Sequence, residues 1–146
     1  MIIAVLKEPA SDTRVSLLPE HIPSLKKWNV DVIIEKGAGE KAFASDKAYA
    51  DAGAKLLDRE AALQSAELIL SINPLSEQDT NQCKARVLFG LFQPLYQPAM
   101  MSEWAAKGFT VFSIDMLPRT TRAQSMDVLS SQANIAGYKA VLTAAN

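Results

Sequence analysis

The chain has 146 residues, of which 49% are hydrophobic and 21% charged, and this composition is that of an ordinary globular domain. A chain of this length buries about two-thirds of the surface that its unfolded form exposes, so it needs neither a metal nor disulfides to fold. The formal net charge of −1 and the single cysteine exclude a broadly basic nucleic-acid surface and an internal disulfide framework.

No apolar run approaches the roughly 20 residues that are needed to cross a bilayer. The chain begins directly with the apolar residues 2–6, without the basic segment that opens a signal peptide. We therefore expect a cytoplasmic protein with one domain over residues 1–146.

Five short runs of aliphatic and β-branched residues recur along the chain, at residues 2–6, 30–34, 67–72, 87–92 and 110–114. They are apolar almost throughout rather than alternating, which is typical of strands covered on both faces of a parallel sheet. The segments between them favour helices, and this alternation predicts an open α/β sheet.

Three of the intervening helices have recognisable faces or ends. The first places four apolar side chains on one face: Leu18, Ile22, Leu25 and Trp28. The second begins at the capping residue Ser45 and turns three side chains inward: Ala48, Tyr49 and Ala52. The third spans residues 94–107, ends at Gly108, and offers three core side chains: Met100, Met101 and Trp104.

The last third of the chain differs in character, because the polar residues 116–127 precede a helix from about Leu129 to the end. Small residues recur on this helix at helical spacing: Ala133, Ala136, Gly137, Ala140 and Ala144. Another surface can approach such a helix closely, and we expect its packing partner to lie outside this chain.

The segment from Gly37 to Ala42 follows a predicted strand and matches the loose form of the dinucleotide fingerprint, with Asp58 about twenty residues further on. In a true fingerprint the helix begins at the second glycine, so that its N-terminus faces the pyrophosphate. Here the better helix start is Ser45. A turn that requires positive φ is therefore the favoured interpretation of Gly37 and Gly39.

The chain offers little for metal binding, nucleophilic catalysis or acid–base catalysis. His21 is the only histidine and has no cysteine near it, so it predicts a surface or capping role rather than a metal site. Cys83 has no base to pair with it, which argues against a nucleophile. We expect no metal and no acid–base catalytic residue.

Four polar residues follow predicted strands, at the edge where open α/β sheets place their ligands. These candidates to face a ligand are Lys7, Arg14, Asn73 and Gln93. Arg14 suits a clamp for a carboxylate or phosphate, and a local ion pair with Glu8 or Asp12 is an equally good interpretation.

The loop over residues 119–130 is the strongest functional signal. It gathers amide, hydroxyl and charged groups before a helix start: Arg119, Gln124, Asp127 and Ser130. These groups suit the amide and hydroxyl groups of a polar ligand, and they bind them without any change in protonation. Composition alone leaves open a solvated connection in which Asp127 or Ser130 caps the last helix.

Residues 118–141 read PRTTRAQSMDVLSSQANIAGYKAV and closely resemble the signature of the proton-translocating NAD(P) transhydrogenase alpha subunit. Further agreements, at Lys7-Glu8, at Thr13-Arg14-Val15 and at residues 35–39, are shared with the wider alanine dehydrogenase and transhydrogenase N-terminal domain family. Thr120 and Thr121 depart from the usual signature.

This resemblance implies that the chain is a flavodoxin-like α/β domain, with an open, mostly parallel sheet and helices on both faces. The helix 129–146 would lead to a Rossmann NAD-binding domain that this chain lacks. NAD(H) would lie in the cleft between the two domains and NADP(H) on a partner component. A membrane component, a homodimer and a peripheral position at the inner membrane are also implied.

By the same resemblance, Arg119 and Asp127 orient the nicotinamide of NAD(H), Gln124 bridges toward the second nicotinamide, and Ser130 binds near the ribose or carboxamide. Hydride transfer between two nicotinamides requires positioning rather than a general base. In alanine dehydrogenases a lysine and a histidine serve the amino acid. Asn73 and Gln93 stand at the matching positions, which argues against alanine oxidation.

We therefore expect the N-terminal domain of the NAD(H)-binding component of a transhydrogenase, inactive on its own. Two alternatives remain: a non-catalytic interaction module of the same fold that pairs through its last helix, and a fragment of an alanine dehydrogenase-like enzyme.

Overall fold

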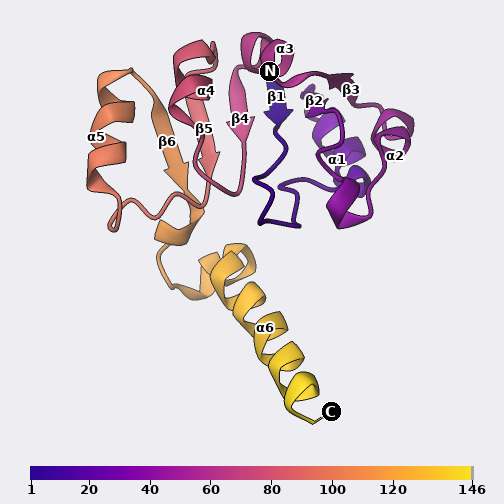
Figure 1. Ribbon diagram of the computed structural model, residues 1–146, viewed down its shortest axis with the longest axis vertical. Helices are drawn as coiled ribbons and strands as arrows, with labels where there is room; N and C mark the ends of the chain where they lie inside the picture. The colour runs from indigo at the N-terminus through magenta and orange to yellow at the C-terminus, as the bar shows by residue number, and fades with distance from the viewer. Residues whose placement is uncertain (146) are drawn as a thin grey trace.

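One parallel sheet with the strand order β3-β2-β1-β4-β5-β6 organises the fold (Figure 1). The structure is a computed structural model that describes residues 1–145. The strands are β1 (Ile2–Val5), β2 (Asp31–Glu35), β3 (Lys55–Leu57), β4 (Leu68–Leu70), β5 (Val87–Gly90) and β6 (Thr110–Ser113). Every neighbouring pair is parallel.

Five of these strands are the predicted ones, and β3 is the addition. The five alone have the order β2-β1-β4-β5-β6, which is the 2-1-3-4-5 order of flavodoxin-like sheets. The α/β class and the parallel sheet are therefore confirmed. The edge strand β3 pairs only with β2.

The helices lie on both faces of the sheet. They are α1 (Ile22–Lys26), α2 (Asp46–Asp51), α3 (Arg59–Ser65), α4 (Glu77–Gln82), α5 (Pro98–Ala106) and α6 (Val128–Ala144). Helix α5 begins four residues later than predicted, because residues 93–97 form a turn in which the Gln97 amide donates to the Gln93 carbonyl at 3.1 Å.

Alternate side chains of β1 and of Leu6, the residue that follows it, enter two separate core layers, as the twofold period of an extended chain requires. Ala4 and Leu6 pack in the layer that contains Leu63 of α3 and Trp104 of α5. Ile3 and Val5 pack in the opposite layer, which contains Tyr49 of α2. The predicted core role of Trp104 and Tyr49 is confirmed, since both side chains are almost completely buried.

The predicted apolar face of the first helix is wrong at its two ends. Ile22 is fully buried, but Trp28 is 76% exposed. Helix α1 ends at Lys26, and Trp28 lies in the following turn, where Asn29 has φ +57°. Leu18 precedes a short 3-10 helix and is also exposed. The helix therefore begins too late to bury Leu18 and ends too early to bury Trp28.

Arg59 connects three elements near the carboxyl edge of the sheet. Its Nε and Nη2 donate to the two carboxylate oxygens of Asp79 at 2.9 and 2.8 Å, and Nη1 donates to Glu35 at 2.8 Å. The side chains of Asp79 and Glu35 are only 10% and 13% exposed. The bonds from Arg59 hold the pKa of Asp79 below its ordinary value.

We expect Arg59→Met to lower the free energy of unfolding by roughly 2–3 kcal/mol, because it leaves two nearly buried carboxylates without their partner. This is less than the cost of breaking a fully buried pair, since Arg59 is itself 38% exposed. The pKa of Asp79 is depressed in the folded state, so this stabilisation is present above the unfolded pKa and is lost as the pH falls. Urea unfolding between neutral and acidic pH measures both effects.

The matched control is Arg86→Met, because Arg86 is exposed and donates only a 3.3 Å bond to the Lys107 carbonyl. It should change stability by less than about 0.5 kcal/mol. Equal losses in the two variants would contradict a specific role for Arg59.

Candidate functional site

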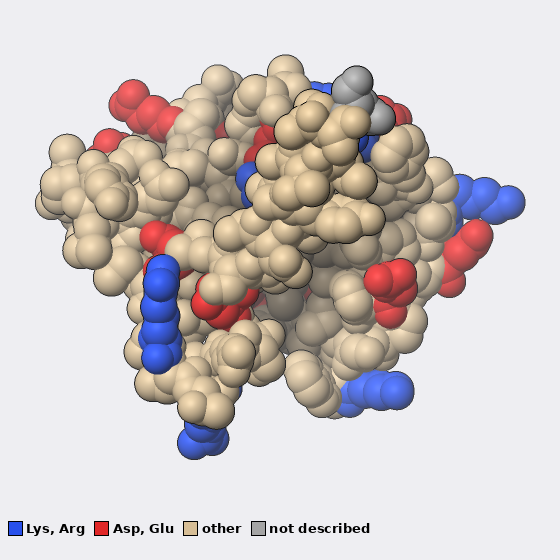
Figure 2. All heavy atoms as spheres, turned by 90° about the horizontal axis from the view of Figure 1, so that it is seen from below, with Lys and Arg blue, Asp and Glu red and all other residues tan. Residues whose placement is uncertain are grey.

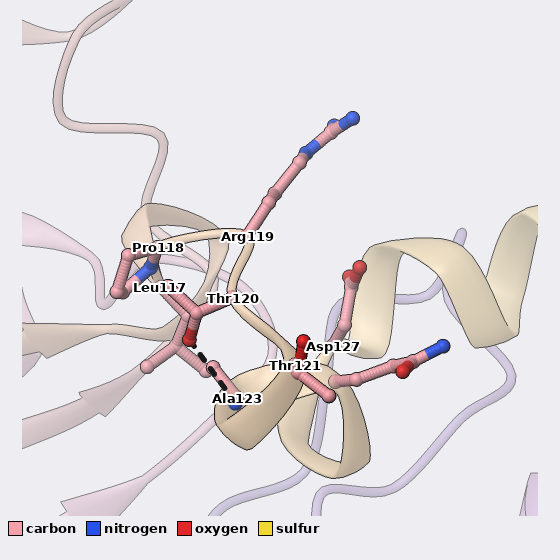
Figure 3. A pocket seen from close by; sticks show the side chains of 8 residues that line it. Leu117, Pro118, Arg119, Thr120, Thr121, Ala123 and Asp127 are labelled. Atoms are coloured by element: carbon pink, nitrogen blue, oxygen red, sulfur yellow. Dashed lines mark hydrogen bonds between the residues drawn. The ribbon is translucent and has the colours of Figure 1, made fainter.

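The loop that follows β6 encloses a pocket at the carboxyl edge of the sheet, where open α/β sheets bind their ligands. The loop passes from a 3-10 helix at Ile114–Met116 to a second one at Thr121–Met126 and then enters α6. The pocket has a volume of about 270 Å³ (Figure 3). Its lining residues are Leu117, Pro118, Arg119, Thr120, Thr121, Ala123, Gln124 and Asp127.

Short-range bonds give this loop its shape. The Thr120 amide donates to the Pro118 carbonyl at 2.8 Å, and the Ala123 amide donates to the Thr120 carbonyl at 3.0 Å. Thr120 Oγ1 also accepts from the Ala123 amide at 3.4 Å (Figure 3). Ala123 is buried and anchors the loop on the domain. Thr120, one of the two departures from the signature, therefore supports the turn with its hydroxyl.

Asp127 caps helix α6. Its Oδ1 accepts from the Ser130 amide at 3.0 Å, and its Oδ2 accepts from the Ser130 hydroxyl at 2.6 Å. The Ser130 hydroxyl is the main reason that the pKa of Asp127 lies below its ordinary value. The cap predicted for Asp127 is thus present, and the same carboxylate also lines the pocket.

Arg119 and Gln124 present their side chains at the surface of the pocket. Both residues are exposed, and neither side chain makes a hydrogen bond or an ion pair among the described residues 1–145. In Figure 3 the Arg119 side chain extends out of the loop on the side toward which the Asp127 carboxylate also points. The loop thus offers guanidinium and amide donors beside a carboxylate acceptor, and none of these groups is enclosed in the core.

Lys7 and Asn73 lie at a second polar hollow, of about 330 Å³, between the ends of β1 and β4. The Asn73 amide donates to both Glu8 and Asp12 at 2.9 Å. Glu8 also accepts from the backbone amides of Ile72 and Asn73, at 2.6 and 3.0 Å. Internal partners therefore fix Asn73 in place, and Glu8 is the buried residue on which this arrangement depends.

Arg14 forms the local ion pair that was one of its two interpretations. Its Nε and Nη2 donate to the two oxygens of Asp12 at 3.0 and 2.7 Å. This pairing lowers the pKa of Asp12 and raises that of Arg14. Gln93 is exposed in the turn that follows β5. Its φ of +49° is a conformation that costs energy for a residue other than glycine.

In the glycine loop after β2, the amide of the first glycine is already occupied inside the protein. Gly37 has φ +74°, and its amide donates to Asp46 at 2.9 Å. Asp58 caps α3 by accepting from the Ala61 amide at 2.9 Å. Gly39 has an ordinary φ of −92°. A glycine is needed there because the position has no room for a side chain: a Cβ would lie 2.6 Å from both the Ala44 carbonyl oxygen and the Tyr49 ring.

We expect Gly39→Ala to lower the free energy of unfolding by about 1–3 kcal/mol, the usual cost of overpacking. The backbone oxygen of Ala44 cannot move aside without disturbing the turn. Thermal unfolding measures the change. The control is Gly137→Ala in the exposed helix α6, where a Cβ meets no described atom within 4 Å and where alanine should stabilise by up to about 1 kcal/mol. The same sign of change in both variants would contradict this explanation.

Other reactive groups are not arranged for catalysis. Cys83 is buried, and burial raises the pKa of its thiol. His21 is exposed and lies 3.6 Å from Glu20. Among residues 1–145 no three His, Cys, Asp or Glu side chains are grouped to hold a metal ion. Within the same residues, no helix has the length and apolar character that a membrane crossing requires.

Residues 4–136 match the family model described as the alanine dehydrogenase/PNT N-terminal domain. The chain belongs to this family. The match covers the whole sheet except the first residues of β1, and it extends through the pocket loop into α6.

Transhydrogenases are prominent among the relatives of this family member. The NAD(P) transhydrogenase subunit alpha of Cereibacter sphaeroides is 39% identical over 137 residues, which are 92% of this chain and 26% of that protein. The crystal structure of transhydrogenase from Sinorhizobium meliloti matches with a TM-score of 0.93 and 37% identity, over 99% of this chain and 44% of that chain. The chain thus spans less than half the length of either relative.

The fold is also shared with an L-alanine dehydrogenase structure, which matches with a TM-score of 0.72 at 24% identity over 79% of this chain and 32% of that one. This lower likeness establishes the common architecture of the family. The chemistry of this member must be argued from its own loop residues.

Proposed function

We propose that this domain forms one wall of an NAD(H) site in an NAD(P) transhydrogenase, and that the loop over residues 119–130 orients the nicotinamide end. The observation that carries the proposal is the pocket itself. It gathers Arg119, Gln124 and Asp127 at the carboxyl edge of the sheet. The names and the 37–39% identity of the transhydrogenase relatives support the assignment.

The donor set fits a carboxamide. A carboxamide has a carbonyl oxygen that accepts and an NH₂ group that donates. Arg119 supplies charged donors for the carbonyl oxygen. Asp127 keeps acceptor capacity for the NH₂ group, because a carboxylate has about four lone-pair sites and Ser130 occupies two. Gln124 both donates and accepts, which suits a bridge to a second polar group.

The size of the pocket indicates that the site is completed elsewhere. Its volume of about 270 Å³ lies below the roughly 300–1,000 Å³ of sites that enclose a whole drug-sized ligand. One end of a dinucleotide fits such a pocket, and a second wall must cover the rest. We assign that wall to a Rossmann domain placed after α6, with NADP(H) on a partner component.

When bound, the nicotinamide rings supply the hydride chemistry, and the protein supplies position and exclusion of water. The side chains of this loop suit that division. Asp127 has a lowered pKa and remains ionised near neutral pH, and an arginine stays protonated. The domain therefore binds and orients without holding or moving a proton.

The rest of the proposed assembly is what the resemblance of residues 118–141 to the transhydrogenase signature implies. It comprises the NADP-binding component, a membrane component and a homodimer, with this domain on the cytoplasmic side, peripheral to the inner membrane. Alanine oxidation is disfavoured by the family resemblance, because Asn73 and Gln93 stand where alanine dehydrogenases have a lysine and a histidine. Glu8 and Asp12 already hold the Asn73 amide.

We expect isothermal titration of the 146-residue chain with NADH to give no binding in the micromolar range. The reason is that this domain provides only one wall of the site. A chimera that joins this chain to the remainder of the Cereibacter sphaeroides subunit should bind NADH. Micromolar binding by the isolated chain would overturn the two-wall proposal, and failure of a folded chimera to bind would count equally against it.

In that chimera, assembled with its partner components, Arg119→Ala should slow hydride transfer from NADH by roughly 10- to 100-fold. The magnitude corresponds to a charged hydrogen bond of about 1.5–3 kcal/mol. Arg122→Ala is the matched control, because Arg122 is an exposed arginine of the same loop that does not line the pocket. The control should change the rate less than about threefold. Equal losses would indicate a general effect of charge and contradict a specific contact by Arg119.

A further inference from the structure

We infer that Ser113 is a positioning residue for the pocket loop, which comprises residues 117–127. Its hydroxyl joins the entry of this loop to the buried chain after β5 and thereby sets where Arg119 is held. Ser113 itself does not line the pocket, so it acts only through the loop. The expected effect on hydride transfer rests on the proposed function, whereas the structural link can be tested without any cofactor.

The need for such a link arises because β6 is an edge strand. It pairs only with β5, and the register ends at Gly90 and Ser113. Beyond this pair, no backbone hydrogen bond within residues 1–145 joins the turn at residues 91–97 to residues 114–127. The hydrogen-bonded connection between the two segments is made by one side chain instead.

That side chain is Ser113. Its Oγ accepts from the backbone amide of Phe92 at 2.9 Å and donates to a carboxylate oxygen of Asp115. A hydroxyl can accept and donate at the same time. Asp115 lies in the 3-10 helix Ile114–Met116, which leads directly to Leu117, the first residue that lines the pocket. A single oxygen atom thus connects the turn after β5 with the entry of the pocket loop.

The core end of this connection is held rigidly. Phe92 is completely buried, and its ring packs edge-on against Trp104 with the centroids 5.1 Å apart. The ring also fills the space above Gly90, where a Cβ would lie 2.6 Å from it. The Phe92 amide therefore has a fixed position, and the hydroxyl that it binds is fixed with it. The same bond holds the start of the strained turn at Gln93.

The rest of the pocket loop has little to hold it. Ala123 is the one buried residue between Ile114 and Asp127. The far end of the loop continues into α6, which projects toward the viewer in Figure 2 and has no buried residue. Arg119 lies between the anchors at Ser113 and Ala123, so the direction of its guanidinium depends on both. A displacement of only about 1 Å near reacting groups can cost about 100-fold in rate.

Hydrogen exchange and amide chemical shifts of the 146-residue chain, measured by NMR, test the link itself. In Ser113→Ala the Phe92 amide should exchange roughly 5-fold faster, the order expected for one lost hydrogen bond, and the Arg119 amide shift should change. Ser113→Thr keeps a hydroxyl and suits a strand, so it should restore both. Asp115→Ala breaks only the loop half of the link: it should move the Arg119 shift and leave Phe92 protected.

The matched control is Ser102→Ala, which removes a hydroxyl that donates to the Pro98 carbonyl at 3.0 Å on the exposed surface of α5. It should alter neither measurement. Loop shifts that stay unchanged in Ser113→Ala would overturn the inference. Loop shifts that change equally in Ser113→Ala and Ser113→Thr would also overturn it, because the hydroxyl would then not be the cause.

Hydride transfer by the chimera with the Cereibacter sphaeroides subunit, assembled with its partner components, separates positioning from a general loss of stability. Ser113→Ala should lower kcat roughly 10-fold and change the KM for NADH less than about twofold, because the proposed second domain holds the rest of the dinucleotide. Ser113→Thr should recover the rate. An unchanged kcat in Ser113→Ala, beside a slowed Arg119→Ala, overturns the positioning role alone. An unchanged rate in Arg119→Ala contradicts the proposed function, and the loop shifts then decide the role of Ser113.

Discussion

The common direction of the six strands is the constraint on which the rest of the structure depends. Because every strand is parallel to its neighbours, every loop that follows a strand arrives at the same edge of the sheet. Residues that are far apart in the sequence thereby become neighbours: Glu8 contacts Asn73 across 65 positions. The chemistry of the domain is therefore a property of one edge, and no single motif determines it.

At that edge, the polar side chains on one side are paired with one another, and those on the other side remain free to bind a ligand. Around β1, β2 and β4, carboxylates and cations form ion pairs with one another. Arg59 pairs with Asp79 and Glu35, and Arg14 pairs with Asp12. Around β6, Arg119 and Gln124 keep their donors at the surface. The paired groups around β1, β2 and β4 can bind a ligand only after their bonds inside the protein are broken. For this reason the loop after β6 is our proposed binding site.

Local signals in the sequence predicted much of the fold. The five apolar runs became strands, Ser45 became a cap by accepting from the Ala48 amide at 3.2 Å, and Gly108 follows α5 at φ +79°. The edge strand β3 was missed because three residues, one of them Lys55, carry no recognisable pattern. The pairing of Asn73 with Glu8 and Asp12 was also missed, since it depends on which loops the sheet brings together. The grouping of Arg119, Gln124 and Asp127 was foreseeable because one short loop contains all three.

Asp127 links the helix α6 to the pocket. Asp127 ends the pocket loop and starts the helix, so the orientation of α6 and the position of the pocket carboxylate are fixed together. Whatever covers α6 therefore also sets how firmly Asp127 is held beside Arg119. A helix with no buried residue gives that carboxylate only its bonds to Ser130. A docked helix would immobilise the first turn as well, which reduces the entropy that a bound ligand must otherwise remove. Assembly and ligand orientation are thus linked through a single capping residue.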